Sequence, residues 1–369
     1  MADYREAFIG IDVAKHRNAV AVADAGRDGE IRFLGEFDAA PESMRRLLAR
    51  MASKYDRLHI CYEAGPTGYG LYRQVVASGH DCIVVAPSLV PRKPGDRVKT
   101  NRRDAVVLAR LLRAGELTAV WAPDEAHEAL RDLVRARESA VEDLRRKRQA
   151  VSSLMLRQGR IYPGKTTWGA RHARWLQQQR FDHPAHQIVL QEMVLGVRHA
   201  KERLDRIEAA IAEFVPSWSL APIVTALQAL RGVNLISAVT FMVEVGDLGR
   251  FESPRQLMGY LGMVPSERST GDRVQRGSIT KAGNGRARRT LVESAWTYRY
   301  PPRIGKAKLY RLEGVSPTIR DIAWKAQSRL CARYRMLTSR GKKSTVAVTA
   351  VARELAAFMW AIAREVKPA

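Results

Sequence analysis

The chain has 369 residues and a hydrophobic content of 46%, which is enough for two or three folded domains. Its 62 Lys and Arg against 38 Asp and Glu leave a net charge of +24, so the expected partners are polyanions. The three cysteines lack CxxC spacing, which argues against a zinc site. They are expected to be free thiols, as is usual in the reducing cytoplasm. Neither a signal peptide nor a membrane span is expected, because no long uncharged apolar run occurs.

The first 113 residues alternate between strand and helix patterns. Short β-rich runs predict strands, and apolar residues at helical spacing predict helices. The strands are expected at 8–14, 19–25, 31–37, 58–62 and 81–85, and the helices at 41–53, 69–77 and 101–113. This order is that of a ribonuclease-H-like α/β fold, in which a three-strand antiparallel meander precedes alternating parallel strands and helices.

The remainder of the chain is mostly helical in pattern. Two long amphipathic stretches, 125–159 and 186–215, predict an antiparallel coiled-coil hairpin or an oligomerisation arm. A compact module over 218–310 precedes two further helical stretches at 316–337 and 344–365. We therefore expect three domains, which are an α/β catalytic domain over 1–120, a helical coiled-coil region over 121–216 and a helical domain over 217–369.

Two acidic residues stand at the ends of predicted strands. Asp12 lies within the apolar run Ile-Gly-Ile-Asp-Val, and a buried carboxylate needs a partner or a metal. Glu63 ends another apolar strand and precedes Ala-Gly-Pro-Thr-Gly. The plainer interpretations are a turn-capping Asp12 and a solvent-facing Glu63. Because site residues gather at strand ends in α/β sheets, both carboxylates are candidates for one site.

Asp104 and Asn101 face the same way on the helix that begins near 101, since they are three residues apart. The alternative is that Thr100 or Asn101 caps the helix and Asp104 favours its dipole. Three carboxylates at one point repel one another unless a cation neutralises them, and Mg²⁺ prefers such oxygen ligands. A basic chain around this site predicts a phosphodiester substrate, with backbone contacts from nearby cations: Lys99, Arg102 and Arg103.

The segment 259–284 interleaves hydroxyls, glycines and cations, which suits a loop that binds phosphate, although a flexible basic surface loop has the same composition. Ser269 is the candidate nucleophile, with Ser266 and Thr270 as neighbouring alternatives. No His–Asp partner is apparent, so activation by metal, Arg or Lys is expected. The cations predicted to contact nucleic acid here are Arg273, Arg276, Lys281, Arg286 and Arg288. Upstream, residues 230–237 suit either the glycine hairpin of a helix-hairpin-helix unit or an ordinary packing corner.

Together these motifs resemble the DEDD transposases of bacterial insertion sequences, which include Piv-type invertases and bridge-RNA-guided recombinases. The resemblance covers nearly the whole chain and rests on four segments: 9–15, 62–65, 98–105 and 259–284. It implies a RuvC-like N-terminal domain, a coiled-coil arm and a C-terminal transposase domain with a catalytic serine. Asp12, Glu63 and Asp104 match three acidic positions of the family, and Asn101 stands at the fourth.

The resemblance also implies a mechanism and partners. The serine, which corresponds to Ser269 or Thr270, attacks a DNA phosphate and forms a phosphoserine link, with Mg²⁺ or Mn²⁺ at the carboxylates. A structured guide RNA encoded by the element pairs with target and donor double-stranded DNA. Joining two duplexes requires a homo-oligomer, a dimer or a tetramer. The expected location is the bacterial cytoplasm, in association with the nucleoid.

Three other classes share part of this pattern. A RuvC-like nuclease or Holliday-junction resolvase would use the carboxylates with water and would not need Ser269. A sugar kinase or actin-like ATPase also carries Gly-Ile-Asp in its first strand, but members of that class are rarely as basic as this chain. A nucleic-acid packaging protein would explain the charge but not the acidic cluster.

Overall fold

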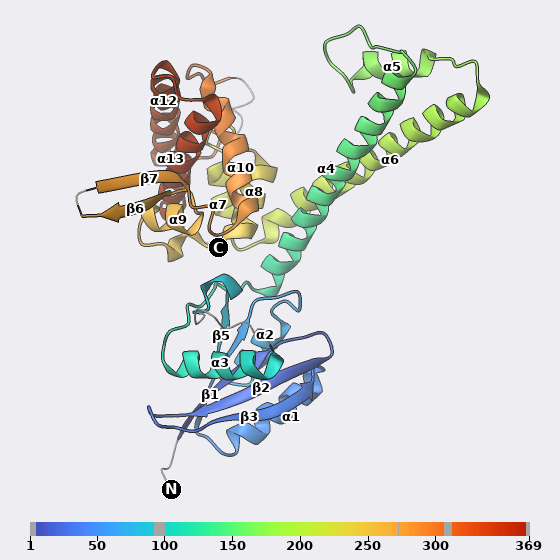
Figure 1. The fold of residues 1–369 in the computed structure, drawn as a ribbon. Coiled ribbons are helices and arrows are strands. Elements are labelled where there is room, and N and C mark those ends of the chain that lie inside the picture. The colour runs from blue at the N-terminus through green and yellow to red at the C-terminus, as the bar shows by residue number, and fades with distance from the viewer. Residues whose placement is uncertain (1–4, 92–99, 272, 306–311, 367–369) are drawn as a thin grey trace. The chain divides into compact units, whose positions relative to one another are not determined.

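The computed structural model describes residues 5–91, 100–271, 273–305 and 312–366. The chain divides into two compact units, Met1–Asp124 and Glu125–Ala369. The first is an α/β unit and the second is mostly helical (Figure 1). A mixed α/β N-terminal part followed by a helical C-terminal part agrees with the class expected from the sequence.

The N-terminal unit is built on a five-stranded sheet with the strand order β3-β2-β1-β4-β5. β1, β2 and β3 pair antiparallel, whereas β4 runs parallel to β1 and β5 runs parallel to β4. The predicted order of three strands followed by alternating helices and strands is confirmed. The elements are β1 (Glu6–Asp12), β2 (Arg17–Asp24), β3 (Ile31–Asp38), α1 (Pro41–Ala52), β4 (Arg57–Glu63), α2 (Gly70–Ala77), β5 (Asp81–Val85) and α3 (Asn101–Arg113).

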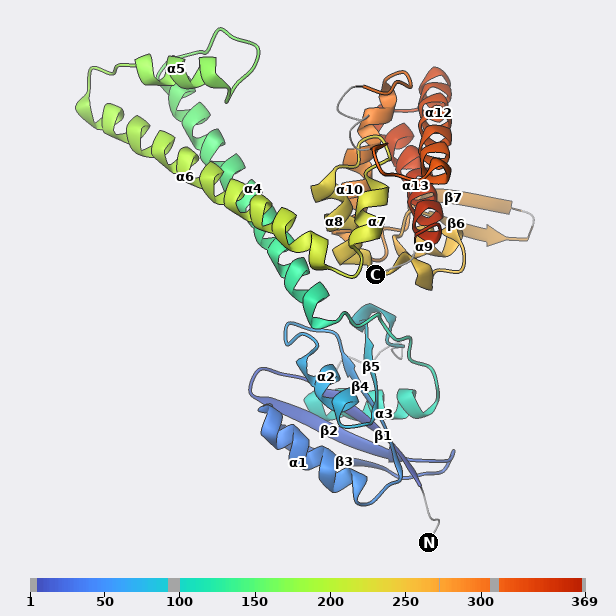
Figure 2. The ribbon, with the colours of Figure 1, turned by 180° about the vertical axis from the view of Figure 1, so that it is seen from behind.

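Helices cover both faces of this sheet, and Figures 1 and 2 show α3 on the face opposite α1. Ile9 and Ile11 of β1 belong to the core that α1 and α2 complete. The alternate residue Gly10 meets α3, because side chains along a strand point to opposite faces in turn. On that same side the small Ala21 of β2 packs against Ala105 and Ala109 of α3. Small residues therefore bring α3 close to the sheet.

The three cysteines are free thiols. Cys61 and Cys331 are buried, and Cys82 is partly buried. Burial raises the pKa of the Cys61 thiol far above its ordinary value and that of Cys82 to about 12. Thiols with raised pKa values are poor nucleophiles and poor metal ligands, which agrees with a packing role.

The C-terminal unit begins with a helical hairpin. Its long helices α4 (Glu125–Arg157) and α6 (Pro184–Phe214) lie side by side in both ribbon views (Figures 1 and 2). They run antiparallel, since Arg137 pairs with Glu208 while Lys147, farther along α4, lies against Gly196. The turn between them contains a short helix, α5 (Ala170–Gln178), which the sequence analysis did not foresee.

The rest of this unit is a helical bundle with one β-hairpin. Its core joins the apolar faces of the helices to the first turns of α4, through Leu130 and Val134. The predicted helical stretches at 316–337 and 344–365 are confirmed as α12 and α13. The elements are α7 (Ala221–Leu227), α8 (Leu235–Val245), α9 (Pro254–Tyr260), β6 (Pro265–Thr270), β7 (Arg273–Ile279), α10 (Gly285–Ala295), α12 (Pro317–Ser339) and α13 (Ser344–Arg364).

Helix α13 is long and apolar enough to cross a membrane by length and composition, and the bent pair of α6 and α7 passes the same test if it counts as one span. Half of the most apolar window of α13 is buried inside the unit, where Val351 and Leu355 are inaccessible to solvent. A core helix of this kind needs an apolar composition for packing alone.

Gly10→Ala is expected to destabilise the N-terminal unit by about 1–3 kcal/mol, the usual cost of overpacking. A Cβ at this position would lie 2.4 Å from backbone atoms of Ala105 and Ala109, which cannot swing away as a side chain can. Differential scanning calorimetry of the full chain measures the change. Gly70→Ala, at the first residue of α2, is the matched control because nothing lies within 4 Å of its added Cβ. Equal melting temperatures for the two variants would contradict the close contact.

Candidate active site

Asp12 and Glu63 end neighbouring parallel strands at the same level. Ile11 of β1 is in register with Tyr62 of β4, so the next residues along, Asp12 and Glu63, stand side by side at the carboxyl edge of the sheet. Neighbouring strands lie about 4.8 Å apart. Asp12 and Glu63 point to the same face of the sheet as Gly10, which lies two positions before Asp12. Helix α3 covers this face.

Helix α3 brings its first turn to this same edge. Its last residue, Arg113, donates to the carbonyl oxygens of Asp24 and Gly29, and Asp24 pairs with Ala7 near the start of β1. Helix α3 therefore runs antiparallel to β1, and its N-terminal turn, which contains Asp104, points to the end of β1 where Asp12 lies. The topology gathers the three predicted carboxylates at one edge.

The N-cap of α3 is Thr100, whose side chain accepts a hydrogen bond from the backbone N–H of Arg103 at 3.3 Å. Asn101 is the first residue of the helix and is exposed, so it does not serve as the cap. The guanidinium of Arg102 lies over the ring of Phe33, with 5.5 Å between its central carbon and the ring centroid. Lys99, the other predicted phosphate contact of this segment, lies outside the described residues.

The carboxylates share an edge, but the side chains do not converge as a metal cluster. Within the described part of the chain, no three His, Cys, Asp or Glu residues are grouped closely enough to bind an ion. The side chains of Asp12, Glu63 and Asp104 nevertheless offer carboxylate oxygens, which are the ligands that hard divalent cations prefer. The backbones of these residues already lie close together, so only their side chains would have to reorient to bind an ion at this edge.

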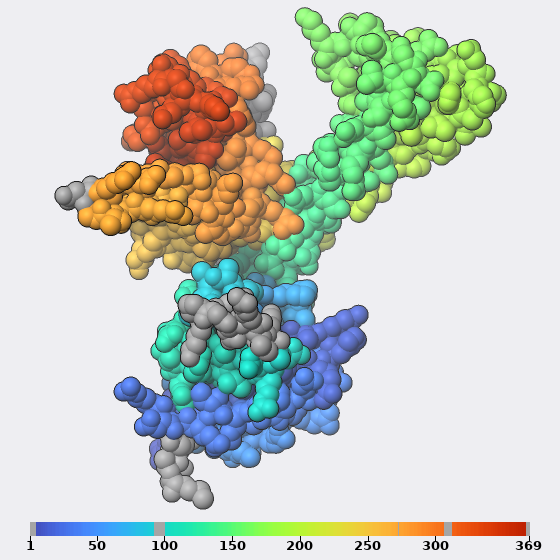
Figure 3. All heavy atoms as spheres, in the orientation of Figure 1, coloured from blue at the N-terminus to red at the C-terminus, as the bar shows by residue number. Residues whose placement is uncertain are grey.

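Ser269 lies on the exposed hairpin of β6 and β7, which Figure 3 shows on the surface of the C-terminal unit. Its hydroxyl donates a hydrogen bond of 2.8 Å to Oε1 of Glu267. Glu267 also accepts a hydrogen bond of 3.2 Å from Nε of Arg276 across the hairpin. These hydrogen bonds, first that from Ser269 and then that from Arg276, hold the pKa of Glu267 below its ordinary value.

The hairpin register separates Ser269 from its two alternatives. Ser269 stands opposite Val274 and Glu267 opposite Arg276, and residues two apart on a strand share a face. Thr270 points to the other face, where it pairs with Arg273 next to the turn at Gly271. Ser266 lies against Gly277, where an added Cβ would come within 2.5 Å of its hydroxyl. Ser269 is the hydroxyl that contacts a carboxylate.

The predicted cations of the C-terminal unit have different surroundings. Arg276 is paired with Glu267, and Arg286 with Oε2 of Glu138 at 2.6 Å. Arg288 donates to the carbonyl oxygens of three residues: Leu261, Ala282 and Gly283. Arg273 is exposed, and Lys281 is a non-glycine residue with positive φ, +58°. Their roles in nucleic-acid binding remain predictions.

Residues 230–237 form a tight corner between α7 and α8. Gly232 has a φ of +79°, and an added Cβ would lie 2.3 Å from the carbonyl oxygen of Ser294. Asn234 and Ser237 form a capping box at the start of α8. The glycine is explained by close packing, which favours the packing corner over the phosphate-binding hairpin.

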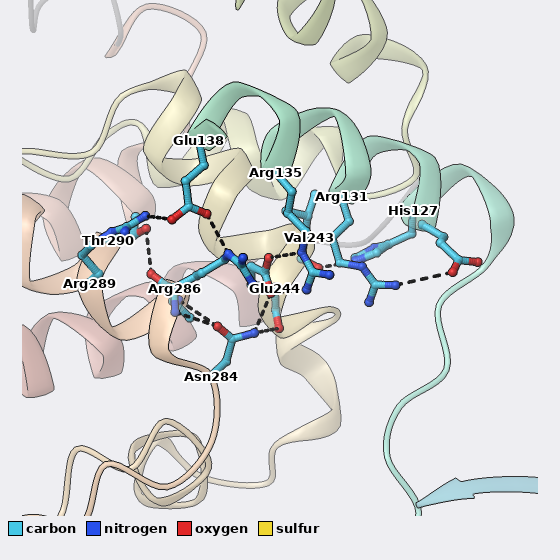
Figure 4. A network of polar contacts seen from close by, with 12 residues as sticks. His127, Arg131, Arg135, Glu138, Val243, Glu244, Asn284, Arg286, Arg289 and Thr290 are labelled. Carbon is cyan, nitrogen blue, oxygen red and sulfur yellow. Dashed lines mark hydrogen bonds and ion pairs between the residues drawn. The ribbon is translucent and has the colours of Figure 1, made fainter. Parts of the chain in front are cut away.

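A polar network joins α4 to α8 and α10 (Figure 4). Glu244 of α8 has a side chain only 1% exposed, and it accepts two hydrogen bonds from Arg135 at 2.9 and 3.0 Å. Asn284 donates to the same carboxylate at 2.6 Å and caps α10 with its own oxygen. Glu138 lies between Arg286 and Arg289 at the beginning of α10. The network anchors the helical hairpin to α8 and to the start of α10, the helix that follows the hairpin of β6 and β7.

Burial acts to raise the pKa of Glu244, but the hydrogen bonds from Arg135 and Asn284 and the nearby positive charge outweigh it. The pKa of Glu244 therefore lies below its ordinary value of 4.5. Its contribution to stability is complete above pH 4.5, and it is lost as the pH falls through the lower folded-state value.

Three glutamates of these sites were not identified from the sequence. The segment 259–284 was predicted as a loop but contains the strands β6 and β7. Predicting a strand there would have revealed Glu267, because a residue two positions before Ser269 shares its face of a strand. Glu244 was also detectable, as a lone charge in the apolar run 241–245. Glu138 carries no such signal, because it lies on an ordinary charged helix face.

Comparisons with known proteins agree with one family. A family model described as "Transposase IS116/IS110/IS902 family" matches residues 224–308. A DEDD-type model of IS110, described as "Transposase", matches residues 9–158. The predicted transposase y4qE of Sinorhizobium fredii is 69% identical over 367 residues, covering 100% of this chain and 91% of that protein. The transposase for insertion sequence element IS1533 of Leptospira borgpetersenii is 30% identical over 344 residues, covering 92% and 99%.

Arg135→Ala is expected to destabilise the C-terminal unit by about 3 kcal/mol at neutral pH, since it leaves a buried carboxylate without its cation. The loss should shrink as the pH falls from 4.5 through the lowered pKa of Glu244, because a protonated carboxyl no longer needs the cation. Thermal unfolding of the full chain at several pH values measures both effects. Arg145→Ala, on the exposed face of the same helix, is the matched control and should not change the melting temperature. A destabilisation by Arg135→Ala that does not vary with pH would contradict the role of the buried pair.

Proposed function

The chain belongs to the IS116/IS110/IS902 family of insertion-sequence transposases, and from this premise we propose that it cuts and rejoins DNA through a phosphoserine link at Ser269. Transposases cleave and rejoin DNA and bind the ends of their element and the target. A DEDD transposase domain implies dependence on a divalent metal. The observation that supports the serine step is the hydrogen bond from Ser269 to Glu267.

The N-terminal unit is proposed to have a ribonuclease-H-like, RuvC-like fold. Support comes from the sheet order β3-β2-β1-β4-β5, with three antiparallel strands next to parallel ones, and from helices on both faces. The proposed domains are the catalytic domain over 1–120, the helical arm over 121–216 and the transposase domain over 217–369.

The metal site is proposed at the carboxyl edge of the sheet. Asp12, Glu63 and Asp104 would hold Mg²⁺ or Mn²⁺, and Asn101 would contribute a neutral oxygen where the family has an acid. When bound, the ion supplies positive charge that polarises the phosphate and stabilises the leaving oxygen. The strand register and the direction of α3 support this assignment, because they place these residues at one edge.

The serine step requires a hydroxyl that is oriented and can lose its proton. As the bond from Oγ of Ser269 to phosphorus forms, the bond from phosphorus to one deoxyribose oxygen breaks. The serine proton passes to Oε1 of Glu267, and the released oxygen takes up a proton from solvent and becomes the free hydroxyl end of the DNA strand. The hydrogen bonds from Ser269 and Arg276 lower the pKa of Glu267, so its carboxylate is ionised and accepts the serine hydroxyl's hydrogen bond before the reaction. The link retains the energy of the phosphodiester for rejoining to a second DNA strand.

The partners are proposed to be double-stranded DNA and a structured guide RNA that supplies sequence recognition by base pairing. The net charge of +24 supports binding of both polyanions. Bringing two duplexes together calls for a dimer or tetramer, and the hairpin of α4 and α6 offers an extended surface for it. The protein would act in the bacterial cytoplasm at the nucleoid.

Covalent trapping separates the serine mechanism from a RuvC-like nuclease that uses water. The purified protein, its co-expressed RNA, labelled element-end DNA and Mg²⁺ should give a protein–DNA adduct on a denaturing gel. Ser269→Ala should abolish the adduct, whereas Thr270→Ala should retain it. Glu267→Gln should slow its formation by about 100-fold, the usual contribution of a positioned proton acceptor. Cleaved DNA without an adduct, unaffected by Ser269→Ala, would support the nuclease.

Metal binding is measured without DNA, by calorimetric titration of Mn²⁺ into the full chain. Asp12→Asn should weaken binding at least about tenfold through loss of a carboxylate ligand. Asn101→Asp should strengthen it by adding a charge. Asp28→Asn, in the exposed turn before β3, is the control and should bind as the wild type does. Unchanged affinity in the Asp12 variant would remove this residue from the metal site.

A further inference from the structure

The turn of the helical hairpin contains a cavity that the proposed recombination chemistry does not use. It has a volume of about 680 Å³ and lies between the end of α4, helix α5 and the first half of α6. Cavities of about 300–1,000 Å³ are the usual size of small-ligand sites. Leu176, Leu190 and Val194 form part of its apolar wall, and polar side chains complete it.

Two polar atoms at this cavity are buried and have no hydrogen-bond partner among the residues that the structure describes. They are Nδ1 of His172, whose residue is only 5% exposed, and Nε of Arg148. Burial lowers the pKa of His172, so its imidazole is neutral at physiological pH. A buried polar atom without a partner is costly, and a bound molecule with hydrogen-bonding edges would remove that cost at both positions.

Aromatic rings contact the side chains of both His172 and Arg148. Trp168 makes an edge contact with His172, with 5.0 Å between ring centroids, and His172 stacks on Trp175 at 5.6 Å. The guanidinium of Arg148 lies over the Trp168 ring at 5.3 Å. Trp168 has a φ of +65°, which a bulky residue rarely adopts outside a constrained site. The backbone is thus strained at an aromatic side chain that lines the cavity.

The cavity is also positively charged. Four cations line it, Arg148, Arg180, Arg198 and Lys201, against one carboxylate, that of Glu202. Arg198 is 4.0 Å from Glu202 and Lys201 pairs with Asp205, whereas no acidic partner of Arg148 or Arg180 is seen in the described part of the chain. A ligand that joins a flat, hydrogen-bonding ring to a negative charge matches this lining.

We infer that this cavity binds an unpaired nucleotide of a nucleic-acid strand, with the base against Trp168 and His172 and the phosphate near the lining cations. Stacking on aromatic rings within a basic groove is the general mode of single-strand recognition. The inference rests on the proposed function only in taking nucleic acid as the partner. The helical hairpin would then hold a strand at its turn in addition to joining protomers.

Photo-crosslinking tests this placement directly. The full chain is mixed with single-stranded RNA or DNA of about 12 nucleotides carrying 5-iodouracil, or with the corresponding duplex, and adducts are mapped by mass spectrometry. We expect crosslinks within 168–175 for at least one single strand and none for the duplex. A stronger RNA adduct would identify the guide as the source, and a stronger DNA adduct the unpaired DNA. Crosslinks that map only elsewhere would overturn the inference.

Affinity measurements distinguish a ligand-binding cavity from one whose side chains only stabilise the turn of the helical hairpin by packing. His172→Phe retains an aromatic ring and removes Nδ1, so it should weaken single-strand binding by about tenfold while the melting temperature stays equal or rises. Trp324→Ala removes an exposed tryptophan of α12 and is the matched control, expected to bind as the wild type does. Fluorescence anisotropy at fixed salt gives both values. Wild-type affinity in His172→Phe would show that the cavity is only packing.

This binding assay involves no strand cleavage, so its result and that of covalent trapping are independent. An adduct at Ser269 together with unchanged binding by His172→Phe would reject the nucleotide site alone. Crosslinks at the cavity without any serine adduct would reject the phosphoserine mechanism and leave the nucleotide site in place.

Discussion

The N-terminal site depends on the close approach of α3 to β1 at Gly10. With 2.4 Å between a hypothetical Cβ and the backbone of α3, no other residue fits there without moving the helix. The contact is reinforced by Ala21 of the neighbouring strand β2, which packs against Ala105 and Ala109 of α3. It fixes how far the first turn of α3 lies from the end of β1. The geometry of the acidic edge is therefore determined by packing between residues that have no chemistry of their own.

Much of this edge could be predicted from the sequence because it follows from local rules. Alternating apolar runs defined the strands, and Asp12 and Glu63 at their ends implied a shared edge once the strands were taken as parallel neighbours. The direction of α3 and its contact with Gly10 could not be predicted, because they depend on residues about 95 positions apart. The sequence also could not predict whether the three carboxylate side chains come together. They share an edge, but they form no metal cluster within the described residues.

The serine hairpin shows a different limit. Candidate nucleophiles one residue apart look equivalent in sequence, but strand pairing turns Ser269 and Thr270 to opposite faces. Only one of those faces carries the carboxylate of Glu267 and its partner Arg276. The sequence analysis sought a His–Asp partner or a cation and passed over Glu267, because its two-residue spacing becomes meaningful only when the segment is a strand. Helix α5 was missed for a related reason, since a short helix rich in Arg, Trp and Gln lacks a long apolar period.

Net charge alone does not say which cations meet nucleic acid. Arg135 neutralises a buried glutamate, and Arg288 binds backbone carbonyls, so both have structural partners that phosphate would have to replace. Arg286 and Arg289 are intermediate, since they share the partly exposed Glu138. Exposed ion pairs are weak and are exchanged readily, whereas buried ones are not. A phosphate can therefore compete with Glu138 for these two arginines but not with Glu244 for Arg135, so the polar network keeps α10 anchored while two cations of its first turn remain accessible to an anion.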